Sequence, residues 1–171
     1  GKQDEAIQCY RQALAVKPDS YEARFNLGNV LAKQGELDEA VLCYRNTIAL
    51  NPDFHAAHSN LGNALNEQGR PSEAAACYEK AIALKPEFAE AHFNVGNALK
   101  DQGRLDEAVA SYRRALALEP NWPEAYYLLG NALRDQDRFE EVLDCYRKAL
   151  SIKPDYVEAR WALAMSQMPA V

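Results

Sequence analysis

Residues 21–54, YEARFNLGNVLAKQGELDEAVLCYRNTIALNPDF, recur with variations along almost the whole 171-residue chain. A proline closes this stretch, and its counterparts follow at a constant step of 34 residues: Pro18, Pro52, Pro86, Pro120 and Pro154. Two further columns keep the same step, one of glycines (Gly28, Gly62, Gly96 and Gly130) and one of tyrosines (Tyr10, Tyr44, Tyr78, Tyr112 and Tyr146). A strict period of this length indicates an array of repeated structural units.

Each unit is predicted to contain two helices. Arg24, Leu27, Gly28 and Leu31 follow the i, i+3, i+4, i+7 spacing that places side chains on one face of a helix. Residues 40–50 repeat this apolar spacing in the second half of the unit. The second helix should end before the proline, because the residue preceding a proline is pushed out of the helical conformation.

Glycine separates the two helices in three of the units, at Gly35, Gly69 and Gly103. Glycine adopts a left-handed conformation at little steric cost and commonly ends a helix, so these positions predict tight interhelical turns. Asp137 takes the equivalent position in the fourth unit and must therefore accept or avoid that conformation. Asp19, three residues before Glu22, suggests an N-terminal cap for the first helix of the next unit.

A glycine in the middle of a helix costs about 1 kcal/mol relative to alanine, so the Gly28 column needs a compensating reason. We expect that reason to be close helix approach. The small Gly28 and Ala40 columns can interlock with the bulky Tyr44 column if the two helices of a unit pack antiparallel.

The pattern of Leu27-Gly28, Leu31, Ala40, Tyr44 and Pro52 resembles the tetratricopeptide repeat. The resemblance implies an all-α fold, a right-handed superhelix of about ten antiparallel helices. We expect one array over residues 1–171, with residues 1–20 as a lone second helix and residues 157–171 as a lone first helix. The four complete repeats would span residues 21–54, 55–88, 89–122 and 123–156.

Charge and cysteine usage narrow the partners and the compartment. The chain has 19 Lys and Arg against 25 Asp and Glu, a formal net charge of −6, and no basic stretch longer than Arg113-Arg114, so neither nucleic acid nor a membrane is expected as a partner. Cys9, Cys43, Cys77 and Cys145 belong to one repeat column, where neighbouring members should be too far apart for a disulfide. Reduced thiols fit a cytoplasmic, reducing compartment.

No cofactor, metal or catalytic site is expected. A cluster of His55, His58 and His92 can be drawn, but no recognised metal motif accompanies these histidines. His58 and His92 occupy the position at which the tetratricopeptide repeat usually has tryptophan, which favours a packing role. Since the chain also lacks a nucleophile elbow, phosphate loop or dinucleotide fingerprint, it is not expected to be an enzyme.

The first helix of each unit carries a second stripe that is rich in asparagine. The resemblance implies that first helices line the concave surface, where an asparagine amide can donate to and accept from an extended peptide backbone. The predicted peptide-binding residues comprise this ladder and its flanking aromatics: Asn26, Asn29, Asn60, Asn63, Asn94, Asn97, Asn131, Phe25, Phe93 and Tyr127. An alternative for the Asn29 column is that it only ties helices together.

These features predict a non-catalytic scaffold that grips an extended protein or peptide segment in its concave groove. The Asn26, Asn60 and Asn94 column also resembles the asparagine ladder of the O-linked N-acetylglucosamine transferases, although Leu128 and Ala162 interrupt it. A substrate-recognition arm of a larger enzyme, such as a glycosyltransferase, is therefore one alternative. The groove columns lack the lysine and arginine that a clamp for acidic tails would need.

An oligomerisation scaffold is the other alternative. The initial helix, with Ala6 and Tyr10, and the final helix, with Trp161, Leu163 and Met165, each lack half of a repeat. A unit that cannot bury its apolar face alone seeks a neighbour, so the sequence predicts possible head-to-tail self-association through these two ends.

Overall fold

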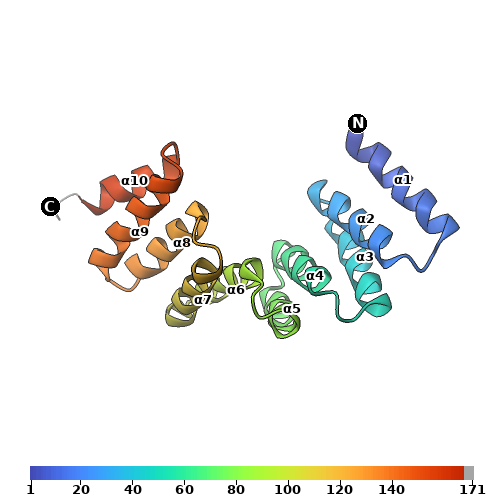
Figure 1. Cartoon of the computed structure of the whole chain (residues 1–171), viewed down its shortest axis with the longest axis horizontal. Coiled ribbons are helices and arrows are strands. Elements are labelled where there is room, and N and C mark those ends of the chain that lie inside the picture. Colours follow the sequence, from blue (N-terminus) through green and yellow to red (C-terminus); the bar gives the residue numbers. More distant parts are fainter. Residues whose placement is uncertain (168–171) are drawn as a thin grey trace. The chain divides into compact units, whose positions relative to one another are not determined.

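The computed structural model describes residues 1–167, which form ten α-helices and no strand. The helices are α1 (Lys2–Val16), α2 (Tyr21–Lys33), α3 (Leu37–Leu50), α4 (His55–Glu67), α5 (Pro71–Leu84), α6 (Ala89–Asp101), α7 (Leu105–Leu118), α8 (Pro123–Arg134), α9 (Phe139–Ile152) and α10 (Val157–Ser166) (Figure 1). The all-α prediction is confirmed. The expected lone first helix at residues 157–171 is described as far as residue 167, and its last four residues lie outside the described part.

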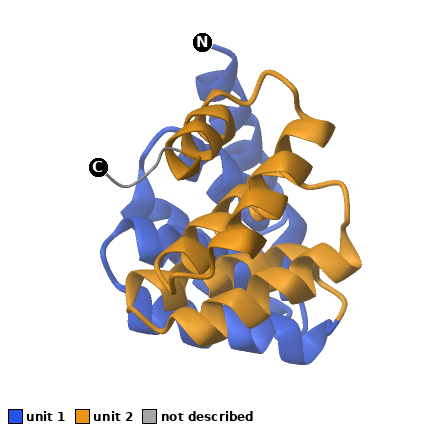
Figure 2. Cartoon of the chain, turned by 90° about the vertical axis from the view of Figure 1, so that its left-hand side faces the viewer, with its two compact units in different colours: residues 1–86 blue, residues 87–171 orange. Residues whose placement is uncertain are grey.

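The helices form two compact units, one comprising Gly1–Pro86 and the other beginning at Glu87 (Figure 2). In each unit, every helix packs against its neighbours in the chain, and α2 also contacts α4. The helices pair as α2–α3 and α4–α5 in the first unit and as α6–α7 and α8–α9 in the second. The division into repeats at residues 21–54, 55–88, 89–122 and 123–156 stays a prediction. That all of them belong to one continuous array remains a prediction.

The interhelical turns have the predicted backbone geometry. Gly35, Gly69 and Gly103 have φ angles of 81°, 73° and 74°, and Asp137 adopts the same left-handed conformation with a φ of 60°. The expected Asp19 cap is wrong. Its neighbour Ser20 is the N-cap of α2, where the Ser20 hydroxyl accepts a hydrogen bond from the backbone N–H of Ala23.

A glycine of each first helix interlocks with a tyrosine of the following second helix. A Cβ atom placed on Gly28 would lie 2.8 Å from the ring of Tyr44, and on Gly62 it would lie 2.5 Å from the ring of Tyr78. In the second unit, Gly96 and Gly130 stand in the same relation to Tyr112 and Tyr146, at 2.7 and 2.6 Å. Close helix approach therefore explains the glycine column.

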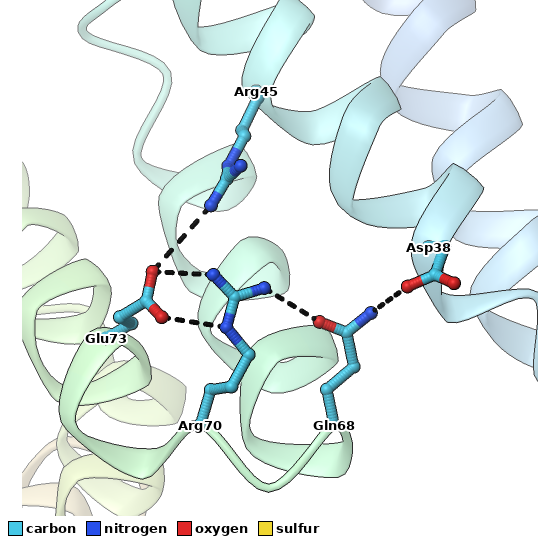
Figure 3. A network of polar contacts seen from close by, with 5 residues as sticks. All are labelled: Asp38, Arg45, Gln68, Arg70 and Glu73. Atoms are coloured by element: carbon cyan, nitrogen blue, oxygen red, sulfur yellow. Dashed lines mark hydrogen bonds and ion pairs between the residues drawn. The ribbon is translucent and has the colours of Figure 1, made fainter.

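A polar network ties the turn of one repeat to the second helix of the repeat before it (Figure 3). Gln68 donates to Asp38 of α3 at 2.8 Å and accepts from Arg70 at 3.1 Å. Arg70 also makes a two-pronged contact with Glu73, at 2.7 and 2.8 Å, and Glu73 faces Arg45 of α3 at 3.7 Å. Because these side chains are largely open to solvent, the network orients the turn more than it stabilises the fold.

Candidate functional site

The Asn29 column is bonded to the tyrosines of the interlock. Tyr44 donates its hydroxyl hydrogen to Asn29 Oδ1 at 2.9 Å, across the pair α2–α3. The bond recurs in every complete repeat, with tyrosine 15 residues after asparagine: Tyr78 to Asn63, Tyr112 to Asn97 and Tyr146 to Asn131, at 2.7–2.9 Å. Burial raises the pKa of Tyr44 to about 12, so the hydroxyl keeps its proton and remains a donor. This column therefore joins the two helices of each pair, and a further role of its members in peptide binding stays a prediction.

Asn60 connects the two asparagine columns within the first unit. Its Nδ2 donates to Asn29 Oδ1 at 2.8 Å and so links α4 to α2. The oxygen of Asn29 thus accepts two hydrogen bonds, one from Tyr44 and one from Asn60. Two polar atoms of this pair, Asn29 Nδ2 and Asn60 Oδ1, make no hydrogen bond within residues 1–167. Neither of them is a buried atom without a partner.

Asn26 is the most available amide of the ladder. Its side chain is half-buried on α2 and makes no hydrogen bond within residues 1–167. In the second unit the column continues with Asn94 on α6, whereas Leu128 on α8 packs against the apolar core. Asn63 and Asn94 each have an interaction partner. The first unit therefore brings Asn29 and Asn60 into contact, with Asn26 three residues before Asn29 on α2.

The predicted aromatic residues serve the packing as well as the face. Phe25 lies 5.9 Å from the Tyr44 ring and 4.8 Å from Phe54, measured between ring centroids. In the second unit, Phe93 stacks on Trp122 at 4.5 Å, and Tyr127 lies 5.4 Å from Tyr156. All three predicted aromatics are half-buried, and each packs on the N-cap residue of the next first helix.

Sequence reasoning missed the hydrogen bonds made at the family's usual tryptophan position. Arg24 donates to the carbonyl oxygen of Pro18 at 2.6 Å, and His58 Nε2 lies 2.8 Å from that of Pro52. Arg160 repeats the contact with Pro154 at 2.6 Å. The constant six-residue spacing to the proline was the available signal. These residues close the loop between repeats, which agrees with the packing interpretation of His58.

The four cysteines form no disulfide, and burial raises the pKa of Cys145 to about 11, which favours the thiol. Within residues 1–167, no three His, Cys, Asp or Glu side chains are grouped closely enough to hold a metal ion. No helix in that range is both long and apolar enough to cross a membrane.

The two ends of the described chain differ from the interior. Ala6 and Tyr10 of α1 are half-buried, whereas their counterparts in the interior repeats are buried. On α10, Trp161 is 68% and Met165 59% exposed. Leu163, which the sequence groups with Trp161 and Met165 on the uncompleted final helix, is instead partly buried and packs against the core of the second unit.

Comparison with known proteins identifies the repeats. A family model described as TPR repeat matches residues 1–35, 28–69, 62–103 and 96–137, and one described as tetratricopeptide repeat matches residues 123–156. No curated protein sequence matched the chain.

Solved structures show the same fold. MamA has a TM-score of 0.81 at 25% identity, with 90% of each chain covered. YrrB, described as a TPR protein with an unusual peptide-binding site, has a TM-score of 0.77 at 25% identity, covering 94% of this chain and 83% of that one. TTC0263, described as a thermophilic TPR protein in Thermus thermophilus, has a TM-score of 0.78 at 26% identity, with 97% and 91% covered. The chain belongs to the tetratricopeptide repeat family.

Proposed function

We propose that this protein is a non-catalytic scaffold that grips an extended peptide segment along the face formed by its first helices. The observation that carries the proposal is the unequal use of the amide atoms in the first unit. The oxygen of Asn29 is engaged twice, while Asn29 Nδ2, Asn60 Oδ1 and the whole Asn26 amide are left for another partner.

These groups fit a peptide backbone because a backbone offers one N–H donor and one C=O acceptor per residue. Asn29 Nδ2 can donate to a carbonyl, and Asn60 Oδ1 can accept from an N–H. Because Tyr44 and Asn60 hold the Asn29 side chain from two sides, it loses little rotamer freedom on binding. The description of the structural neighbour YrrB as having a peptide-binding site supports this proposal.

Selection of binders from a random dodecapeptide library, followed by fluorescence anisotropy, tests the proposal. Asn26→Ala should weaken the selected peptides at least tenfold. Asn46→Ala is the matched control, since Asn46 is a half-buried asparagine on the second helix α3 without a hydrogen bond in the described chain. Equal affinity in the two variants would contradict groove recognition through the ladder.

The same amides would also serve as the substrate-recognition arm of a larger enzyme such as a glycosyltransferase, because holding the substrate's backbone needs the same contacts. In that setting Asn26 and Asn60 of the first unit would hold the substrate segment while another domain supplies the chemistry.

Head-to-tail self-association is a second candidate, favoured by the exposed Trp161 and Met165 on α10. Trp161→Glu should abolish any concentration dependence of the mass measured by light scattering. One feature opposes this candidate: Ala164 stands where the interlock has glycine, so its Cβ would press on a docked Tyr10 ring. A constant monomer mass for the unaltered protein would rule it out.

A further inference from the structure

A lysine side chain of the second unit is held by an acidic and an aromatic residue. Lys153, the C-cap of α9, places its ammonium group 3.5 Å from Glu124 Oε1 in the first turn of α8. The same ammonium lies 4.9 Å from the ring centroid of Tyr156, and Tyr127 packs on that ring. One carboxylate and one aromatic ring thus contact the lysine ammonium group, and a second ring packs on the first.

The preceding repeat has the same quartet with one decisive exchange. Glu90, Phe93 and Trp122 stand 34 positions before Glu124, Tyr127 and Tyr156, but the position of the lysine is taken by Glu119. Phe93 and Trp122 form a stacked pair with an interplanar angle of 28°. The aromatic half of the quartet is therefore kept, while the cation is replaced by a second carboxylate.

The two carboxylates of this quartet have no counter-ion in the described part of the chain. No ion pair to Glu90 or Glu119 occurs within residues 1–167, and both side chains are exposed. Partial desolvation and repulsion from Glu119 raise the pKa of Glu90, as expected for like charges held near each other. Glu90 lies three residues before Phe93, and Glu119 three residues before Trp122, the same spacing that separates Glu124 from Tyr127 and Lys153 from Tyr156. Two acids at these positions favour a positively charged group next to the aromatic pair.

We infer that Glu90, Glu119, Phe93 and Trp122 form a site for the ammonium group of a lysine on a bound extended peptide. Lys153 marks, in the next repeat, the position that this ligand lysine would take. The inference rests on the proposed function and adds to it the chemistry of the partner, a basic segment. Charge complementarity selects this occupant: an acidic segment would meet two like charges at this quartet.

Nuclear magnetic resonance of the ¹⁵N-labelled protein tests the site, because the chain has only two tryptophans and Trp161 on α10 provides an internal reference. The probes are two capped pentapeptides, Ser-Ser-Lys-Ser-Ser and the same peptide with norleucine in place of lysine. The lysine peptide should shift the Trp122 indole N–H signal, and the norleucine peptide should shift it at least tenfold less. Equal shifts, or no Trp122 shift with the lysine peptide, would overturn the inference.

Two variants supply the second arm of the test. Glu119→Lys should fill the site from within, as Lys153 does, and lower the affinity for the lysine peptide at least tenfold. Glu140→Lys makes the same charge change at an exposed position in the first turn of α9 and should leave the affinity within about twofold, since salt screens distant charges. Equal effects of the two lysine variants would also overturn the inference.

Failure of this site and failure of the proposed function give different results. If library peptides bind through Asn26 but show no preference for lysine, the scaffold function stands and the lysine site falls. If the lysine peptide shifts Trp122 but no library peptide depends on Asn26, the lysine site stands and recognition through the ladder falls.

Discussion

Replacing Gly62 with alanine should destabilise the protein, although alanine is the better helix former. The new Cβ would lie 2.5 Å from Tyr78 Cε1 and 2.8 Å from Cδ1. Carbon atoms pack best at about 3.5 Å, so the ring would have to retreat by roughly 1 Å. The ring is buried, and its hydroxyl is bonded to Asn63 at 2.9 Å, so this retreat would break the hydrogen bond.

The expected free-energy change follows from three contributions. Overpacking costs about 1–3 kcal/mol and the lost hydrogen bond about 1 kcal/mol, while helix propensity returns about 1 kcal/mol. The net loss should be about 2 kcal/mol, which lowers Tm by roughly 4–8 °C for a chain of this size. Thermal and urea unfolding followed by circular dichroism measure both quantities.

Two controls separate the clash from other effects of the alanine. Asn66→Ala on the same helix α4, outside the glycine–tyrosine interlock, should leave stability unchanged or slightly raised. In the Tyr78→Phe variant the ring is no longer held by a hydroxyl hydrogen bond. Adding Gly62→Ala to that variant should therefore lower the free energy of unfolding by about 1 kcal/mol less than it does in the unaltered protein. A Gly62→Ala protein as stable as the original would refute the close-approach argument.

Three further predictions concern stability. Asn29→Ala should lower the free energy of unfolding, measured in urea, by about 1–3 kcal/mol because it leaves the buried Tyr44 hydroxyl unpaired. Asn26→Ala breaks no hydrogen bond in the described chain and should leave that free energy unchanged. Equal losses in the two variants would contradict the different roles of the two asparagine columns. Asp137→Gly should raise stability by up to about 1 kcal/mol because it relieves a left-handed aspartate, and a drop in Tm would show that the Asp137 side chain compensates for its backbone. The pKa of Tyr44 is raised to about 12 in the folded protein from an ordinary value of 10, so its contribution to stability is complete below pH 10 and is lost as the pH rises toward 12. Tyr44→Phe should therefore flatten the alkaline fall in Tm measured across that window, and an unchanged profile would assign the fall to other groups.

The period of the sequence predicts much of this fold because its main contacts are local. The glycine–tyrosine interlock and the left-handed turns join residues of one repeat, so columns in phase are enough to reveal them. The position of Leu163 was not predicted because the sequence of α10 does not show which of its faces packs against α9. That packing decides which side chains of α10 are buried.

The candidate site could be predicted only in outline. The sequence indicates the asparagine columns, but it does not show on which side of the second helix the Tyr44 hydroxyl emerges, and that detail decides that Asn29 is a structural acceptor. The Glu90 quartet could not be predicted because it combines a helix with the loop between repeats. The quartet is recognised only from the structure, in which Lys153, the counterpart of Glu119 in the next repeat, contacts Glu124 and the Tyr156 ring.

The interlock of Gly28 with Tyr44 also has a kinetic consequence. Its two partners are only 16 positions apart, and the same short separation joins every other glycine–tyrosine pair. Because little chain entropy is lost in closing so short a loop, each helix pair can nucleate independently and quickly. Growth then proceeds by adding helices to an existing edge, so a duplication or deletion of 34 residues changes the length of the protein without requiring a new folding nucleus.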